Sequence, residues 1–208
     1  MLAPGAARLV GPVGAVLALV LVVVVLGWWY LGPLSVAALI LLAGLTTFLL
    51  VFFRDPERSP GDGIVSAADG RVRAVERAGD QWRISVFMNV TNVHVNRFPL
   101  DGEVETIEAS GAGFRPAYLS DADRNVQRRY VLRTALGPVE IVQITGIVAR
   151  RLVSFVRVGS IGRKGERFGM IVLGSRVDVL LPSDRTRPAV EVGQRVWAGR
   201  STIAVEIS

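Results

Sequence analysis

The feature that most constrains this chain is a long apolar run near its N-terminus. No charged side chain occurs between Leu9 and Phe53. Gly32 and Pro33 divide the run into residues 9–31 and 34–53, and each piece reaches the roughly 20 apolar residues that a membrane-spanning helix requires. We therefore predict a membrane anchor over residues 1–53, built as a transmembrane helical hairpin.

The residues that flank this run predict its orientation. Arg8 precedes it, and Arg54 and Arg58 follow it. Since positive charge concentrates on the cytoplasmic side of a membrane, both ends of the hairpin are predicted to face the cytoplasm, which places the following domain on the cytoplasmic face of the cell membrane. A cleaved signal peptide fits poorly, because the run is too long and lacks a clean small-residue cleavage site. A hairpin that enters only one leaflet remains open.

The composition changes after the apolar run. Residues 54–62 hold two prolines among charged and small residues, which is typical of a linker. Residues 63–208 then show short alternating apolar segments separated by glycine-containing turns, a pattern typical of strands. We predict a mainly β (α+β) protein, in which one compact domain of antiparallel strands follows the anchor.

Composition excludes several kinds of chemistry. The 208-residue chain has no cysteine and a single histidine, His94, which rules out disulfides and makes a His/Cys metal site very unfavourable, so no metal is expected. The single lysine, Lys164, lies in a turn-like segment, which disfavours a pyridoxal enzyme because that cofactor needs a lysine. The net charge of +6 suits an anionic partner, and an acidic bilayer satisfies that requirement; no nucleic-acid recognition motif is present.

One strand-like segment combines burial with a reactive pair. Residues 173–182 alternate, so that Ser175, Val177 and Val179 share one face while Arg176 and Asp178 share the other. The carbonyl of Gly174 is sterically open, and the hydroxyl of Ser175 follows it directly. Attack of that hydroxyl turns the amide into an ester, and elimination followed by hydrolysis leaves a pyruvoyl group on a new N-terminus. The simpler interpretation of a Gly-Ser pair is a bulge or turn.

Four motifs occur in a fixed order around this pair. They are Phe53-Arg54-Asp55-Pro56-Glu57-Arg58, Ser66-Ala67-Ala68-Asp69-Gly70, Val93-His94-Val95-Asn96-Arg97-Phe98-Pro99 and Leu173-Gly174-Ser175-Arg176. Together they resemble the short, archaeal-type phosphatidylserine decarboxylase proenzymes. The resemblance implies self-cleavage between Gly174 and Ser175, a pyruvoyl cofactor derived from Ser175, and fragments 1–174 and 175–208 that stay together as a heterodimer. It also implies that the enzyme converts phosphatidylserine in the bilayer into phosphatidylethanolamine and carbon dioxide.

The resemblance also assigns catalytic roles to Ser175, His94 and Asp69. His94 is the only imidazole that can move a proton near neutral pH, and a carboxylate such as Asp69 can orient it. Asp69 in a turn and His94 as a buried strand residue are the plain alternatives. Arg97 occupies the position of a second histidine seen in longer family members, and a guanidinium is a poor base because it stays charged. Either His94 serves both reactions, or Asp69 acts on Ser175 more directly.

Three residues are candidates for binding the substrate: Arg97, Met88 and Arg176. Two other functions remain open from the residues alone. A membrane-anchored serine hydrolase could use Ser175, His94 and Asp69, although no Gly-x-Ser-x-Gly motif surrounds the serine. A non-enzymatic, membrane-anchored β module would need none of these groups.

Overall fold

The computed structural model describes residues 6–27, 32–113, 124–146, 151–172 and 175–207. The chain divides into two units, Met1–Pro56 and Glu57–Ser208. Gly174 of the predicted cleavage site lies outside the described residues.

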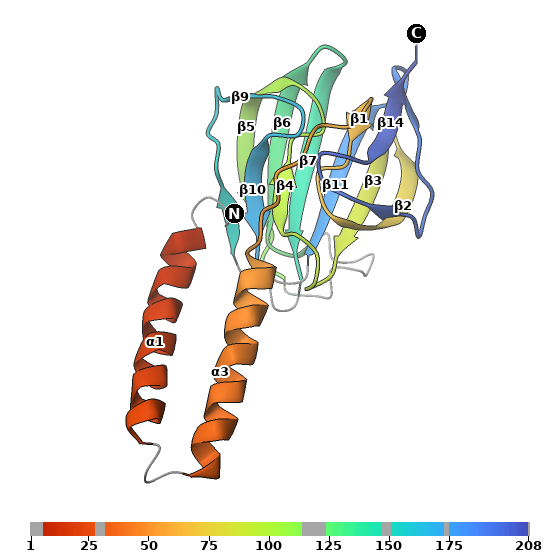
Figure 1. Cartoon of the computed structure of the whole chain (residues 1–208). Helices are drawn as coiled ribbons and strands as arrows, with labels where there is room; N and C mark the ends of the chain where they lie inside the picture. The colour runs from red at the N-terminus through yellow and green to blue at the C-terminus, as the bar shows by residue number, and fades with distance from the viewer. Residues whose placement is uncertain (1–5, 28–31, 114–123, 147–150, 173–174, 208) are drawn as a thin grey trace. The chain divides into compact units, whose positions relative to one another are not determined.

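The N-terminal unit contains two helices, α1 (Ala6–Leu26) and α3 (Pro33–Phe52) (Figure 1). Pro33 opens α3 because its fixed φ suits the first helical position and its missing N–H would have had no partner there. Among the described residues, α3 is the one helix long and apolar enough to cross a membrane, and a shorter apolar helical segment, Gly14–Leu26, lies within α1. The structure thus supports one candidate span, and a hairpin of two spans stays a prediction.

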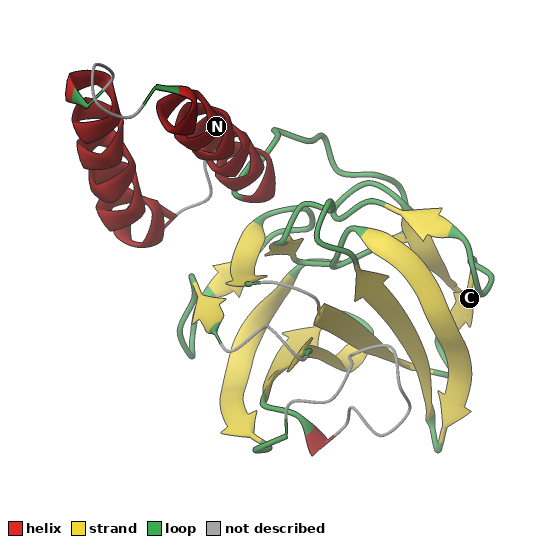
Figure 2. Cartoon of the chain, turned by 90° about the horizontal axis from the view of Figure 1, so that it is seen from below, coloured by secondary structure: helices red, strands yellow, loops and turns green. Residues whose placement is uncertain are grey.

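The second unit is built from antiparallel strands, which confirms the mainly β class. Its main sheet has the order β13-β2-β3-β11-β7-β6-β5-β9, and two three-stranded sheets have the orders β4-β10-β8 and β1-β14-β12. The strands are β1 (Ile64–Val65), β2 (Gly70–Ala78), β3 (Gln81–Met88), β4 (Val95–Arg97), β5 (Gly102–Ser110), β6 (Gln127–Thr134), β7 (Gly137–Thr145), β8 (Leu152–Ser154), β9 (Ile161–Gly162), β10 (Arg167–Ile171), β11 (Ser175–Pro182), β12 (Thr186–Pro188), β13 (Arg195–Val196) and β14 (Thr202–Glu206). Figure 2 shows the strands curled around a common interior.

Strand β11 lies at the centre of the main sheet, between β3 and β7 (Figure 1). Its alternating apolar residues Val177, Val179 and Leu181 are at most 1% exposed and belong to the core. At its start, Ser175 is in register with Met88 of β3 and Thr145 of β7. The most buried strand of the sheet therefore begins at the predicted reactive serine.

One glycine allows the neighbouring strands to approach closely. Gly70 opens β2, and a Cβ built there would lie 2.0 Å from the carbonyl oxygen of Phe87. Only glycine fits such a contact without moving the backbone. Gly70 therefore fixes how β2 lies against the end of β3 that carries Met88.

Candidate active site

Ser175 is fully buried at the first position of β11. Its hydroxyl donates a hydrogen bond to the sulfur of Met88, with an Oγ–Sδ distance of 3.4 Å. A thioether sulfur is a weak acceptor, so this bond orients the hydroxyl without binding it strongly. The structure thus shows the serine side of the predicted cleavage site, and it brings Ser175 and Met88 together.

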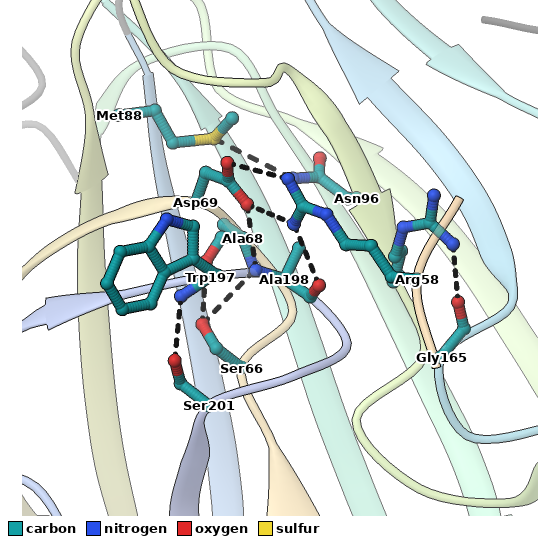
Figure 3. Close-up of polar contacts among 11 residues, drawn as sticks. Arg58, Ser66, Ala68, Asp69, Met88, Asn96, Gly165, Trp197, Ala198 and Ser201 are labelled. Atoms are coloured by element: carbon teal, nitrogen blue, oxygen red, sulfur yellow. Dashed lines mark hydrogen bonds and ion pairs between the residues drawn. The ribbon is translucent and has the colours of Figure 1, made fainter. Parts of the chain in front are cut away.

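A chain of neutral polar groups continues from Met88 into the interior. Asn96 of β4 donates from Nδ2 to the same sulfur at 3.6 Å (Figure 3), and its Oδ1 accepts from Nε2 of Gln143 at 2.7 Å. The Tyr130 hydroxyl in turn donates to Oε1 of Gln143 at 3.2 Å. Burial raises the pKa of Tyr130, against smaller effects of Ser154 and Arg128 that lower it, so the phenol stays a neutral donor. These buried bonds fix the surroundings of Ser175 without a net charge.

Asp69 precedes β2 and is held by a cation and a backbone amide (Figure 3). Arg58 donates to both carboxylate oxygens, with an Nη2–Oδ2 distance of 3.0 Å. The backbone N–H of Ala198 donates to Oδ1 at 2.8 Å, and Arg58 also donates to the Ala198 carbonyl at 2.9 Å. In this structure the carboxylate is therefore bound by Arg58 and Ala198, and an action of Asp69 on His94 stays a prediction.

Arg58 is a candidate site residue that the sequence predicted only as a charge beside the apolar run. A signal for it was nevertheless present, because Arg58 closes the first of the four ordered motifs. Its guanidinium side chain is only 7% exposed beside Asp69. A buried arginine of this kind needs a carboxylate partner, and Asp69 supplies it.

His94 is fully buried immediately before β4. Its backbone carbonyl accepts a hydrogen bond from the N–H of Ile171 at 3.2 Å, which ties this segment to β10. Asn96, two residues further on, contacts Met88 beside Ser175. The fold therefore brings the His94 segment to the strand end that carries Ser175, while the proton transfer assigned to His94 stays a prediction.

The two candidate substrate arginines differ in their surroundings. Arg97 is 4% exposed and donates from Nη1 to the carbonyl of Gly165 at 2.9 Å. Arg176 forms an ion pair with Asp178, with distances of 2.9 Å from Nε to Oδ1 and 3.0 Å from Nη2 to Oδ2. Because residues alternate along β11, this pair lies on the face opposite to Ser175. Contact of either arginine with a substrate stays a prediction.

Metal chemistry has no evident centre in the described part of the chain. Among those residues, no group of three or more His, Cys, Asp or Glu side chains could hold a metal ion.

Comparison with known proteins gives a consistent result. The family model described as phosphatidylserine decarboxylase matches residues 45–204. A phosphatidylserine decarboxylase proenzyme of Thermobifida fusca is 45% identical over 172 residues, which cover 82% of this chain and 77% of that protein. A putative archaetidylserine decarboxylase proenzyme of Methanococcoides burtonii is 42% identical over 179 residues, covering 85% and 80%.

A third relative covers a larger share of the chain. The phosphatidylserine decarboxylase proenzyme of Cupriavidus metallidurans is 41% identical over 203 residues, covering 92% of this chain and 89% of that protein. The match of the family model includes Asp69, His94 and Ser175, together with most of the strands that hold them. On this evidence, the chain belongs to the phosphatidylserine decarboxylase family.

Proposed function

We propose that this chain is the proenzyme of a membrane-bound decarboxylase that converts phosphatidylserine into phosphatidylethanolamine and carbon dioxide. The proenzyme matures by cutting itself between Gly174 and Ser175. One observation carries the proposal: Ser175 is a buried serine at the first position of the central strand, oriented by Met88 and by strands on both sides. The family to which the chain belongs supports the same reading.

Maturation uses the Ser175 hydroxyl as the nucleophile. Its oxygen forms a bond to the carbonyl carbon of Gly174 and the peptide C–N bond breaks, which gives an ester and a free amine on residue 175. Elimination then releases the Gly174 carboxylate, and hydrolysis of the remaining enamine releases ammonia and leaves the pyruvoyl group. We assign the proton transfers to His94, because it is the only imidazole in the chain and is buried beside this strand end.

The two fragments are held together by the sheet itself. Strand β11 pairs with β3 from Ser175 to Pro182 and with β7 from Ser175 to Leu180. The rest of fragment 175–208 adds β12, β13 and β14, and β13 and β14 pair with β2 and β1 of the other fragment. Separation would expose the core face of β11, so the mature enzyme is a stable heterodimer of 1–174 and 175–208.

The buried position of Ser175 also suits the cofactor that the family implies. Formed from Ser175, such a group would supply an electrophilic carbonyl for a primary amine and a sink for the electrons left by departing carbon dioxide. The surrounding side chains exclude water, and the neutral chain through Met88, Asn96 and Gln143 places no fixed charge against the group. Exclusion of water favours loss of a carboxylate, because the charged group is poorly solvated there.

The N-terminal unit supports placement at the membrane. Helix α3 can span a bilayer, and we assign it to the anchor together with α1, over residues 1–53. The positive residues that flank the apolar run favour a cytoplasmic location for residues 63–208. A bilayer substrate and an anchored enzyme then meet at the same surface.

The decisive experiment is the mass of the purified full-length protein. The wild type should give two fragments, one ending at Gly174 and a small one whose N-terminus carries a carbonyl and resists Edman sequencing. Ser175→Ala removes the nucleophile and should give one uncut chain without decarboxylase activity. A wild-type chain that is intact and whose Ser175 reacts with a phosphonate would instead identify a serine hydrolase.

A second variant tests the proton transfer. His94→Ala should slow self-cleavage, decarboxylation or both by about 10²–10⁴-fold, the usual contribution of general acid–base catalysis. The rates of fragment formation and of carbon dioxide release measure the two steps separately. Normal rates for both steps would remove His94 from the mechanism.

A further inference from the structure

An open pocket of about 360 Å³ lies on the outer face of the main sheet, at the end where β2 begins and β3 finishes. Its described lining is dominated by cations and amides and contains no carboxylate. The lining residues that matter here are Arg71, Arg73, Arg195, Asn89, Asn92 and Phe87. A pocket of this composition suits an anion.

Two of these arginines oppose each other directly. Arg195 of β13 is in register with Arg71 of β2. Like charges in opposing positions destabilise a sheet. None of the three arginines forms an ion pair with a carboxylate in the described part of the chain; Arg71 donates to the carbonyl of Gly193 at 2.9 Å. An anion bound between them would remove this repulsion.

Aromatic rings place the guanidinium groups of Arg73 and Arg195. Arg73 lies over the ring of Phe87, 5.9 Å from its centroid, and Arg195 lies over the ring of Trp197 at 5.5 Å. Arg73 also falls in a register shift of β2, between the paired residues Val72 and Ala74. Such shifts redirect a side chain. Ring stacking leaves the N–H groups of both arginines available to an acceptor.

This pocket adjoins the reactive strand end. Phe87 is in register with Arg176, the residue after Ser175, and Asn89 follows Met88, the register partner of Ser175. Gly70 also lines the pocket and follows Asp69. The pocket thus lies at the same strand end as Ser175 but on the opposite face of the sheet, within a few residues of the site on two strands.

From these observations we infer that the pocket binds the phosphodiester of the substrate lipid and so places the adjoining serine headgroup near Ser175. The inference rests on the proposed function and assigns substrate recognition to Arg71, Arg73 and Arg195. Phosphate oxygens match the planar N–H groups of arginine, and the amides of Asn89 and Asn92 supply further donors. The site thus recognises the phosphodiester, which all serine phospholipids share.

The first test measures kinetics with the full-length mature enzyme in micelles of a non-ionic detergent, where phosphatidylserine is the only anion. Arg73→Gln and Arg195→Gln should each raise KM by about tenfold, since each removes one charge-assisted hydrogen bond. Inorganic phosphate should inhibit the wild type competitively and the double variant much less. Arg77→Gln is the control, because Arg77 lies on the same strand, is exposed and lies outside the pocket lining.

The second test needs no turnover. Full-length Ser175→Ala should bind glycerophosphoserine in calorimetry, and adding Arg73→Gln and Arg195→Gln should weaken that binding by more than tenfold. A KM and an affinity equal to those of the Arg77→Gln control would overturn the inference. So would a defect seen only on vesicles that contain phosphatidylglycerol, because it would indicate attraction to bilayer charge. An uncut, inactive wild type that still binds glycerophosphoserine through these arginines would refute the proposed function and leave the site standing.

Discussion

The two faces of strand β11 are both buried, but their polar groups are satisfied by different interactions. On the inner face, Ser175 joins a chain of neutral groups that passes through Met88, Asn96 and Gln143. On the outer face, Arg176 and Asp178 are 7% and 3% exposed and neutralise each other as an ion pair. The proposed reactive chemistry thus lies on the neutral face, and the ionisable pair lies on the other.

The two faces differ in the free energy needed to remove their polar groups from water. Neutral polar groups need only one good partner each to be buried. Charged groups lose far more hydration free energy on burial, and the attraction within an ion pair offsets this loss only when the geometry of the pair is good. Burial raises the pKa of Asp178, opposed by Arg176, Ser85 and Arg83, so desolvation outweighs the attraction of its neighbours. The Asp178 carboxyl therefore makes stability depend on pH through the outer face.

The largest expected effect comes from breaking the outer pair. Asp178→Ala leaves the Arg176 guanidinium buried without this carboxylate and should reduce the free energy of unfolding by about 3–5 kcal/mol. Replacing both residues, as Arg176→Met with Asp178→Leu, should be close to neutral because no charge remains. Chemical denaturation measures the free energy of unfolding of the single and the double variant, each made in the uncut Ser175→Ala background. Equal losses in the single and double variants would contradict the ion-pair account.

The double variant also tests the sequence prediction that Arg176 binds substrate. Made in the otherwise native, self-cleaving chain, it should retain decarboxylation if Arg176 serves only Asp178. A selective rise in KM would instead support substrate contact. The measurement separates a structural arginine from a binding one.

The same pair predicts a pH dependence. The folded pKa of Asp178 is above its unfolded value, so the folded state binds the proton more readily. The contribution of this group to stability is therefore greatest below the unfolded pKa and falls as pH rises through the folded value. Denaturation midpoints across the acidic range should show this fall in the Ser175→Ala background and lose it in the double variant.

A smaller effect is expected on the inner face. Asn96→Ala leaves the amide of Gln143 without its acceptor and should cost about 1–3 kcal/mol. A double-mutant cycle with Gln143→Leu should show coupling, because the two residues share one hydrogen bond. Additive losses would mean that the neutral chain does not act as a unit.

The smallest change in stability should come from Met88→Leu, which keeps volume and should cost less than about 1.5 kcal/mol. It removes the sulfur that accepts the Ser175 hydroxyl, so self-cleavage should slow while the fold persists. Met170→Leu is the matched control, because Met170 is equally buried on β10. Equal rates of fragment formation in the two variants would show that the sulfur does not orient the serine.

Local sequence patterns predicted a large part of this molecule. Alternation along residues 173–182 predicted that Ser175 and Arg176 lie on opposite faces, because side chains of a strand alternate whatever surrounds them. Turn residues and short apolar segments predicted the antiparallel, mainly β class, which the structure confirms. The ordered motifs predicted the family, which the comparisons confirm. Each of these depends on neighbours in the chain or on motif order.

The contacts that build the site needed the tertiary structure. Asp69 receives hydrogen bonds from Arg58 and from Ala198, which is distant in sequence, and Asn96 meets Gln143 across two sheets. Arg71 faces Arg195 only because β13 returns to the edge of β2. Local sequence patterns do not specify which strands become neighbours. Strand pairing depends on how all the strands pack together in the complete core. The sequence by itself predicted the strand, its two faces and the candidate serine, and the folded sheet decided which groups surround them.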